Sequence, residues 1–276
     1  ALAAGRQISE LTDIPQTALL RPLEAMPRQR EGDTHIVLSS YEQALADKRL
    51  HAENFKLIEI ESNKYSGRDI WQQTGQVAVK VNRAGEPMTT AEIDASFDLP
   101  YTRLPHPRYN GKRIPAYEMI RHSVNMHRGC FGGCAFCTIS AHQGKFIASR
   151  SKQSIMREVE QVTQMDDFKG YISDLGGPSA NMYMMSGRDR DKCARCTRPS
   201  CLHPSPCPNL NNDHAPLLDI YHAVDALPGV KRSFVGSGVR YDLAMHRNAD
   251  NRINDANKRY IEELIMKHVS GRLKVA

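Results

Sequence analysis

The chain has 276 residues, a formal net charge of +6 and a hydrophobic fraction of 40%, which suits one large or two small globular domains with a substantial core. Every apolar run falls short of the roughly 20 residues that cross a bilayer, which excludes a helical membrane protein. The opening A-L-A-A-G-R-Q lacks the architecture of a signal peptide. We therefore expect no membrane partner.

The seven cysteines lie between residues 130 and 207, in clusters rather than spread as a disulfide framework. This distribution favours metal binding in a reducing compartment, so we expect a cytoplasmic protein. The first residue is Ala rather than Met, and the closing G-R-L-K-V-A resembles a strand just beginning after a helix. From these two features we expect a fragment of a longer protein.

A long helix is predicted in the first hundred residues. The apolar I-V-L at 36–38 leads into S-S-Y-E, in which Ser39 is expected to cap the helix and Glu42 to complete a capping box. The helix should run to about Asn63. Apolar residues that recur at helical spacing along it are expected in the core: Tyr41, Leu45, Ala52, Phe55 and Ile58.

A half-buried strand is predicted next, because Val77, Val79 and Val81 alternate with Ala78, Lys80 and Asn82. With the helix, this strand indicates a separate small α+β module over residues 1–95.

Residues 96–120 are predicted to form a proline-rich connector. Their prolines block both a helix and a central strand: Pro100, Pro105, Pro107 and Pro115. His106, in the middle, is expected to be solvated. Basic residues gather here as well, namely Arg103, Arg108, Lys112 and Arg113. A solvated linker explains them best, although an anionic partner such as nucleic acid is conceivable.

From residue 121 onward, strands and helices are predicted to alternate. The expected strands are 123–127, 170–177 and 233–239, with a final strand beginning at L-K-V. One helix is expected to begin at Ser151, with an apolar face that includes Ile155, Val159 and Val162. A second is expected to begin at Pro216, with Leu217, Ile220, Val224 and Leu227 on one face, and a third to span about 251–268. Repeated β-α units predict an α/β fold with a parallel sheet, whose strands carry ligand groups at their carboxyl ends.

The most informative motif is C-F-G-G-C-A-F-C, which places Cys130, Cys134 and Cys137 on one loop. Thiolates are the ligands of iron–sulfur clusters, and three of them leave one iron without a protein ligand. Gly129, Gly132 and Gly133 let the loop fold tightly. Buried structural thiols or half of a zinc site are the alternatives.

The C-x3-C-x2-C spacing, with Phe136 before the last cysteine, resembles the cluster loop of the radical S-adenosylmethionine (SAM) superfamily. The longer R-G-C-F-G-G-C-A-F-C-T-I-S-A-H-Q-G, followed by S-R-S and S-D-L-G-G-P-S-A-N-M-Y, resembles the YgiQ-like branch over most of residues 95–276. The resemblance implies a 4Fe-4S cluster whose open iron is chelated by the amino and carboxylate groups of SAM. It also implies reductive cleavage of SAM to a 5'-deoxyadenosyl radical, with an electron donor such as flavodoxin or ferredoxin. It also implies a partial (β/α)6 barrel, truncated, over 121–276. The substrate does not follow from it.

The resemblance also assigns residues to SAM. Phe136 matches an aromatic position near adenine, and Gly176 and Gly177 match the first two residues of the G-G-E motif that meets the methionine amino group. Pro178 stands where that motif has glutamate. Asp174, two residues before the glycines, is therefore our candidate for holding the ammonium.

Two residues near the end of the third predicted strand are further candidates. Ser237 and Arg240 suit the ribose and the carboxylate of SAM, because a hydroxyl and a forked cation recognise those groups. A structural ion pair of Arg240 with Asp242 is the alternative.

A second cysteine group lies in a long insertion over residues 178–214. It comprises Cys193, Cys196, Cys201 and Cys207, with His203 nearby. Four thiolates at this spacing could enclose zinc or an auxiliary iron–sulfur cluster. Unmetallated thiols or disulfides are the alternative.

Two further functions compete with the radical enzyme. One is a non-catalytic iron–sulfur or zinc-binding protein, which would supply a fourth protein ligand to the first cluster. The other is an RNA-modifying radical SAM enzyme, which the positive charge would suit.

Overall fold

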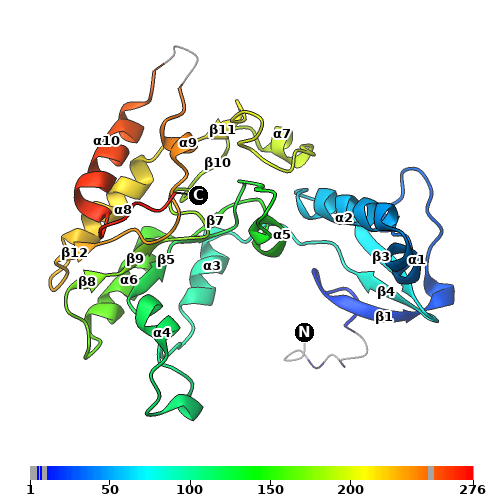
Figure 1. Ribbon diagram of the computed structural model, residues 1–276, viewed down its shortest axis with the longest axis horizontal. Coiled ribbons are helices and arrows are strands. Elements are labelled where there is room, and N and C mark those ends of the chain that lie inside the picture. The colour runs from blue at the N-terminus through cyan, green and yellow to red at the C-terminus, as the bar shows by residue number, and fades with distance from the viewer. Residues whose placement is uncertain (1–4, 6, 8–10, 248–251, 276) are drawn as a thin grey trace. The chain divides into compact units, whose positions relative to one another are not determined.

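The computed structural model describes residues 5, 7, 11–247 and 252–275 of the chain (Figure 1). The chain divides into two compact units. One consists of residues 1–86 with 190–199, and the other of residues 87–189 with 200–276. The predicted module of residues 1–95 overlaps the first unit.

The first unit contains a four-stranded sheet in the order β1-β4-β3-β2. Its strands are β1 (Ala18–Pro22), β2 (His35–Val37), β3 (Asp69–Thr74) and β4 (Val77–Val81). The β1-β4 and β3-β4 pairs are antiparallel, whereas β2 and β3 are parallel. The unit also holds α1 (Tyr41–Ala46), α2 (Lys48–Ser62), α7 (Arg190–Ala194) and the short 3-10 turn η3 (Leu23–Ala25).

The predicted helix exists, but its start is one residue later than expected. Ser40, rather than Ser39, caps α1 and forms the capping box with Gln43. Ser39 is not available because Asn54 binds both its backbone N–H and its carbonyl. Asp47 then ends α1 and caps α2.

The apolar stripe of α1 and α2 was wrongly predicted to be in the core. Tyr41, Leu45, Ala52, Phe55 and Ile58 are all exposed. The buried side chains of α2 are polar instead, namely Asn54 and Glu61.

Glu61 can be buried because its carboxylate is paired. It accepts hydrogen bonds from Lys64 at 2.6 Å and from the Arg68 side chain at 3.0 Å. Pairing of this kind offsets the cost of removing a charge from water.

In β4, too, the buried face is not the one that carries the valines. Ala78 is buried, whereas Val77 is exposed.

The second unit combines short strand pairs with helices. The parallel pairs are β5 (Ser123–Asn125) with β9 (Asp174–Gly176) and β8 (Tyr171–Ile172) with β12 (Arg232–Ser233). The antiparallel pairs are β6 (His127–Arg128) with β7 (Ala148–Ser149) and β10 (Ser186–Gly187) with β11 (Leu210–Asn211). This is a mixed α/β arrangement, and among the described residues no sheet closes into a barrel.

The parallel alignment extends beyond the assigned strands. Leu175 N–H donates to Phe234 O at 2.8 Å, and Phe234 N–H donates to Ile172 O at 2.9 Å. Val239 forms a parallel bridge with Val275. The third predicted strand is therefore assigned only at residues 232–233, although its backbone continues alongside β9. The predicted closing strand forms only this single bridge.

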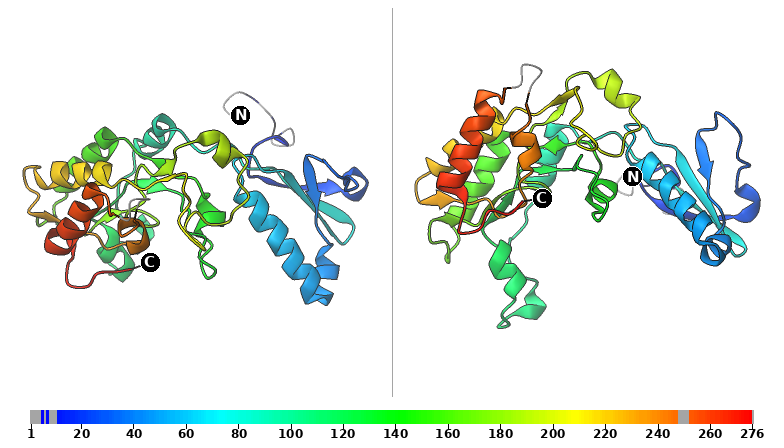
Figure 2. Two further views of the ribbon diagram at one scale, coloured as in Figure 1. Left: turned by 90° about the horizontal axis from the view of Figure 1, so that it is seen from above. Right: turned by 45° about the horizontal axis from the view of Figure 1, so that its top comes forward.

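The helices of the second unit are visible in the two views of Figure 2. They are α3 (Thr90–Phe97), α4 (Pro115–Ile120), α5 (Ile139–Gln143), α6 (Lys152–Thr163), α8 (Ala215–Asp225), α9 (Tyr241–Ala244) and α10 (Asp255–Glu263), with a 3-10 turn at Pro107–Tyr109 and a π-helical turn at Leu264–His268. The predicted helix 251–268 is thus α10 and its π turn, and residue 251 lies outside the described residues.

The core of the second unit confirms the predicted helix faces. Ser151 caps α6 by accepting from Ser154 N–H. Six residues that the spacing predicted are buried to 1% exposure or less, namely Ile155, Val159, Val162, Leu217, Ile220 and Val224. Leu218 and Tyr221 of α8 are buried as well, and the predicted Leu227, past the end of that helix, is partly buried. The helices therefore cover the strands through their apolar stripes.

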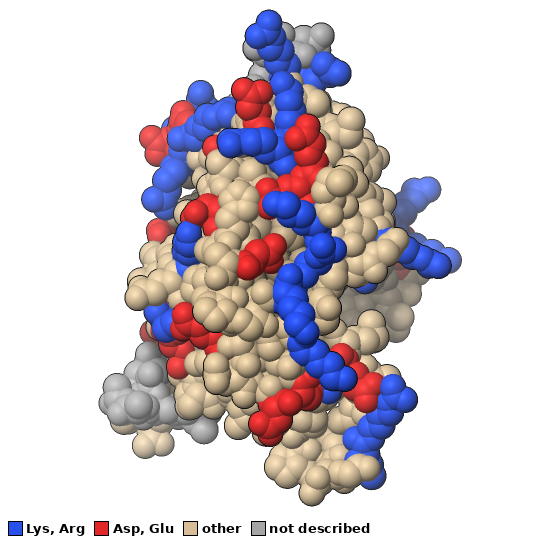
Figure 3. Space-filling model, turned by 90° about the vertical axis from the view of Figure 1, so that its left-hand side faces the viewer, with Lys and Arg blue, Asp and Glu red and all other residues tan. Residues whose placement is uncertain are grey.

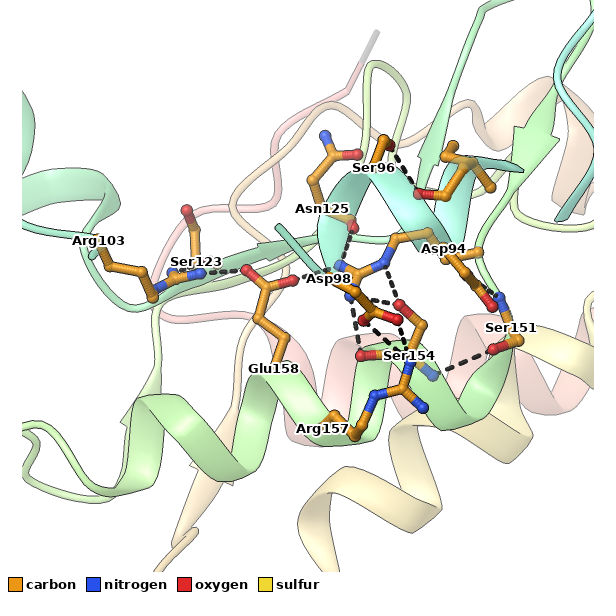
Figure 4. A network of polar contacts seen from close by, with 12 residues as sticks. Asp94, Ser96, Asp98, Arg103, Ser123, Asn125, Ser151, Ser154, Arg157 and Glu158 are labelled. Carbon is orange, nitrogen blue, oxygen red and sulfur yellow. Dashed lines mark hydrogen bonds and ion pairs between the residues drawn. The ribbon is translucent and has the colours of Figure 1, made fainter. Parts of the chain in front are cut away.

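The proline-rich segment is more structured than a solvated connector. Pro115 occupies the first turn of α4, where a missing N–H costs nothing. Arg103 donates to Glu158 and to the carbonyls of Arg121 at 3.0 Å and Ser123 at 2.7 Å (Figure 4). These bonds attach the segment to α6 and to the start of β5.

Candidate functional site

The loop that carries the first three cysteines follows β6 and leads into α5. It is closed at its base, because Cys130 N–H donates to Gly144 O at 3.0 Å, just past the end of α5. Gly129 has a φ of +88°, and a β-carbon there would lie 2.2 Å from Phe146 O. Only glycine fits such a position. The loop therefore needs this glycine to start its turn.

The sulfurs of Cys130 and Cys134 lie around Gly132. A β-carbon on Gly132 would be 3.4 Å from Cys130 Sγ and 3.6 Å from Cys134 Sγ. Cys137 closes the next turn by donating its N–H to Cys134 O at 3.0 Å. Burial raises the pKa of the Cys130 thiol, with the neighbouring sulfurs adding to that effect. Such thiols become good ligands when a metal displaces their protons.

Arg240 extends to this loop. Its Nη1 lies 3.1 Å from Cys134 Sγ, while its Nε and Nη2 donate to the two carboxylate oxygens of Asp242 at 3.0 and 2.5 Å. The ion pair considered as an alternative from the sequence is therefore present. A role in holding a ligand carboxylate stays a prediction.

Asp174, the first residue of β9, lies against Ser237. The Asp174 carboxylate accepts from Gly236 N–H at 2.8 Å, from Ser237 N–H at 3.1 Å and from the Ser237 hydroxyl. These contacts fix the backbone that follows β12. Three accepted bonds already use much of the carboxylate, so its predicted role toward an ammonium group stays untested.

Gly176 and Gly177 lie where the sequence predicted, at the carboxyl end of β9. Gly176 O accepts from Met126 N–H at 2.8 Å. A β-carbon on Gly177 would lie 2.4 Å from His127 Cε1. The double glycine therefore admits a histidine ring from the neighbouring strand.

His127 is a candidate that sequence reasoning missed. Its side chain is buried, and burial, with the nearby Arg128 charge, lowers its pKa to about 4. The ring is therefore neutral at pH 7. Its only sequence signal is its place three residues before Cys130, at the end of a predicted strand.

Phe136, predicted to lie near adenine, is 89% exposed on the loop. Such exposure leaves its ring available for contact with a ligand, and its predicted role stays untested. Phe131, in contrast, is buried in an apolar cluster against which Cys130 packs. Phe131 therefore shields one side of the loop.

Comparison with known proteins relates the chain to a family. A family model described as Radical SAM N-terminal matches residues 1–123. A UPF0313 protein of Bacteroides thetaiotaomicron is 60% identical over 277 residues, which cover 100% of this chain and 44% of that protein. A UPF0313 protein of Porphyromonas gingivalis is 59% identical (100% of the chain, 43% of that protein), and one of Methanocella arvoryzae is 43% identical (100% and 43%).

The chain belongs to the UPF0313 family of radical SAM proteins. It spans less than half the length of these UPF0313 relatives. No solved structure matches it. None of the described helices is long and apolar enough to cross a membrane.

The donor set of this loop, three cysteine thiols, suits an iron–sulfur cluster. Over the described ranges, no group of three or more His, Cys, Asp or Glu side chains is arranged to hold one metal ion. In a four-iron cluster each thiolate binds a different iron, so the sulfurs surround a cube instead of converging on a point. None of the seven cysteines, all within the described residues, is in a disulfide.

The second cysteine group divides into two pairs. Cys193 and Cys196 belong to the first unit, where Cys196 N–H donates to Cys193 O at 3.1 Å. Cys201 and Cys207 belong to the second, where Cys207 N–H donates to Cys201 O at 2.7 Å. A metal bound by these four residues stays a prediction.

The second pair lies against the cluster loop of the UPF0313 chain. Cys201 N–H donates to Phe131 O at 3.0 Å, and the Ser200 hydroxyl donates to Gly132 O at 2.7 Å. Cys201 and Cys207 pack on the same apolar cluster as Cys130. The insertion therefore supports the loop directly, a contact that no local sequence pattern signals.

A cavity of about 500 Å³ lies elsewhere in the second unit, beside α6. Its lining includes Arg103, Arg150, Arg157, Asp98 and Glu158. These charges pair with one another, since Glu158 accepts from Arg103 and Arg150 while Asp98 accepts from Arg157 (Figure 4). These lining charges are therefore satisfied within the protein.

Two of the basic residues of the proline-rich segment pair with carboxylates. Arg103 binds Glu158, and Arg113 binds Glu118 at 2.7 Å. Figure 3 shows Lys and Arg interspersed with Asp and Glu across the face that it presents. Neither observation favours a nucleic-acid surface, and that partner stays untested.

Proposed function

We propose that this chain carries the cofactor site of a radical SAM enzyme, in which Cys130, Cys134 and Cys137 hold a 4Fe-4S cluster. The observation that carries the proposal is the arrangement of the Cys130 and Cys134 sulfurs around Gly132, on a loop closed by Gly144. When bound, the cluster supplies the electron that cleaves SAM to methionine and a 5'-deoxyadenosyl radical, and the substrate is unassigned.

The residues of the chain would bind and shield this group. The apolar cluster of Phe131, Met182, Met185, Leu202, Leu210 and Leu243 packs against Cys130 and keeps one side of the loop dry. A dry, apolar surround affects both the potential of an iron–sulfur cluster and its access to water. Gly176 and Gly177 would let the methionine part of SAM approach the backbone closely.

Several finer parts belong to the same proposal. The parallel β-α units would form part of a (β/α)6 barrel, and Phe136, Asp174, Ser237 and Arg240 would lie near SAM. A reduced flavodoxin or ferredoxin would supply the electron in the cytoplasm. The four insertion cysteines would hold zinc or an auxiliary cluster.

Anaerobic reconstitution with iron and sulfide tests the proposal. We expect a reduced cluster whose EPR spectrum changes when SAM is added, and 5'-deoxyadenosine among the products of the full-length protein. Cys134→Ala should abolish the SAM response, whereas Arg232→Gln, at an exposed position of β12 outside the loop, should keep it.

Two results would contradict the proposal. A reduced cluster that ignores SAM would favour a non-catalytic iron–sulfur protein. Stoichiometric zinc at the first three cysteines, with no bound iron, would favour a zinc protein.

A further inference from the structure

We propose that Arg240 is a positioning residue for the cluster, which acts through the sulfur of Cys134 and makes the cluster easier to reduce. The inference rests on the proposed function, because it requires a cluster on Cys134. It assigns Arg240 a role toward a protein sulfur instead of toward a ligand carboxylate. The contact that carries it is Arg240 Nη1 to Cys134 Sγ, 3.1 Å.

The guanidinium can point only one way. Its Nε and Nη2 form a forked pair with Asp242, at 3.0 and 2.5 Å, so the plane of the group is fixed. Nη1 is the remaining nitrogen, and it faces Cys134. Bidentate pairing of this kind gives arginine a directional hold that lysine lacks.

The backbone of Arg240 is held as firmly as its side chain. Arg240 N–H donates to Asn181 Oδ1 at 2.8 Å, and Asn181 Nδ2 donates to Arg240 O at 2.9 Å. Asn181 is fully buried and also contacts His214 Nε2 at 3.0 Å. His214 is in turn bound to Asn257 on α10, at 2.8 Å. The guanidinium is therefore fixed relative to the loop from several elements.

The loop has room for this contact only because residue 132 is glycine. A β-carbon there would lie 3.1 Å from Arg240 Nη1, as well as close to both sulfurs. Gly132 thus lies between the guanidinium and the thiols. A side chain at this position would compete with Arg240 for the same space.

The expected effect on the cluster follows from charge. An N–H donor on a ligand sulfur, and a positive charge beside it, stabilise the reduced cluster, which carries one more electron. Arginine stays protonated at every working pH, so the effect should not depend on pH. Asp242 neutralises the charge of Arg240, which leaves the directional N–H contact as its main contribution.

The test is an EPR-monitored redox titration of the reconstituted full-length protein. Arg240→Gln removes the guanidinium charge and replaces Nη1 with a shorter amide that ends before the Cys134 sulfur. We expect the reduction equilibrium to become at least tenfold less favourable, which is about 59 mV for a one-electron couple. Arg240→Lys keeps the charge without the fork and should lie between Arg240→Gln and the wild type. Arg232→Gln, on an exposed position of β12, is the matched control and should not shift the potential.

A double variant separates the hydrogen bond from the charge. Arg240→Gln combined with Asp242→Asn keeps the local charge balanced but lacks the donor, so its potential should stay below that of the wild type. Asp242→Asn alone removes a negative charge and should raise the potential.

Three outcomes would overturn the inference. The first is an Arg240→Gln variant whose reduction equilibrium lies within twofold of that of the wild type. The second is a double variant whose reduction potential equals that of the wild type. The third is an Asp242→Asn variant whose potential falls, as that of Arg240→Gln does. In each of these cases a wild-type cluster that still responds to SAM leaves the proposed function intact. A wild-type protein that loads no cluster would overturn both.

Discussion

The imidazole of His127 lies against the backbone of Gly177, so closely that a β-carbon on the glycine would be 2.4 Å from Cε1 and 2.6 Å from Nδ1. His127 begins β6, the short strand before the cysteine loop, and Gly177 follows β9. The contact therefore joins the two strand ends where the proposed cofactor would bind.

Gly177→Ala should destabilise the protein through this contact. The new methyl group would force the buried ring out of place, and overpacking of that kind costs about 1 to 3 kcal/mol. Urea denaturation of the purified protein measures the change. Gly85→Ala is the control, because a β-carbon there would meet only Pro15 at 3.5 Å. Equal unfolding midpoints for the two variants would contradict the prediction.

Much of the second unit could be predicted because its signals are local. The cap of α6 at Ser151 and the apolar spacing of Ile155, Val159 and Val162 involve residues within a few turns of one another. The stripe of α2 was wrong because its polar face is buried instead. Glu61 is stabilised there by Arg68, beyond the end of the helix, and periodicity alone does not reveal such a partner.

Contacts between distant segments explain what the sequence left open at the site. The cysteine spacing indicates a cluster loop by itself. The contact of Arg240 with Cys134 joins residues 106 positions apart, and the support from Ser200 to Gly132 joins residues 68 apart. Neither has a local pattern, since each depends on how strands and insertion pack in three dimensions.

Ser200→Ala should loosen the cysteine loop. The buried Ser200 hydroxyl donates to Gly132 O at 2.7 Å and accepts from Leu202 N–H at 3.0 Å and His203 N–H at 2.9 Å. Its removal leaves buried groups unpaired, at a cost of about 1 to 3 kcal/mol. We expect faster hydrogen exchange across residues 129–138, measured by mass spectrometry.

Ser186→Ala, at an exposed position of the same insertion, is the matched control for Ser200→Ala. It should leave exchange in the cysteine loop at the wild-type rate. If the Ser200 variant also exchanged at the wild-type rate, the insertion would not support the loop.

Acid should weaken the fold between about pH 6.5 and pH 4. Burial lowers the pKa of His127 and of His214 to about 4 in the folded chain. As pH falls below 6.5, the unfolded chain binds these protons first, so stability is complete above pH 6.5 and is lost as pH approaches 4. Each histidine contributes about 3 kcal/mol to that loss.

The pH dependence of urea unfolding tests this expectation. His214→Gln should be less stable than the wild type at pH 7, because it disturbs the bonds to Asn181 and Asn257. It should then lose less stability than the wild type between pH 7 and pH 4.5, since one titrating group is gone. His51→Gln, on an exposed position of α2, should follow the wild-type curve. Parallel curves for His214→Gln and the wild type would contradict the assignment.

Glu158→Gln should lower the free energy of unfolding by more than is usual for a residue on a surface helix. Glu158 accepts from Arg103 and from Arg150, whose side chain is only 1% exposed (Figure 4). Loss of the carboxylate leaves a buried guanidinium without its counter-charge, which costs about 3 to 5 kcal/mol. Asp98→Asn breaks the exposed pair with Arg157 on the same helix and should cost about 0 to 1 kcal/mol. Thermal and urea unfolding of both variants measure the difference.

The Glu158 variant should also loosen the chain just before β5. Arg103, which would lose its carboxylate partner, also binds the carbonyls of Arg121 and Ser123. If the two variants unfolded at the same midpoint, the buried pair would not hold this segment in place.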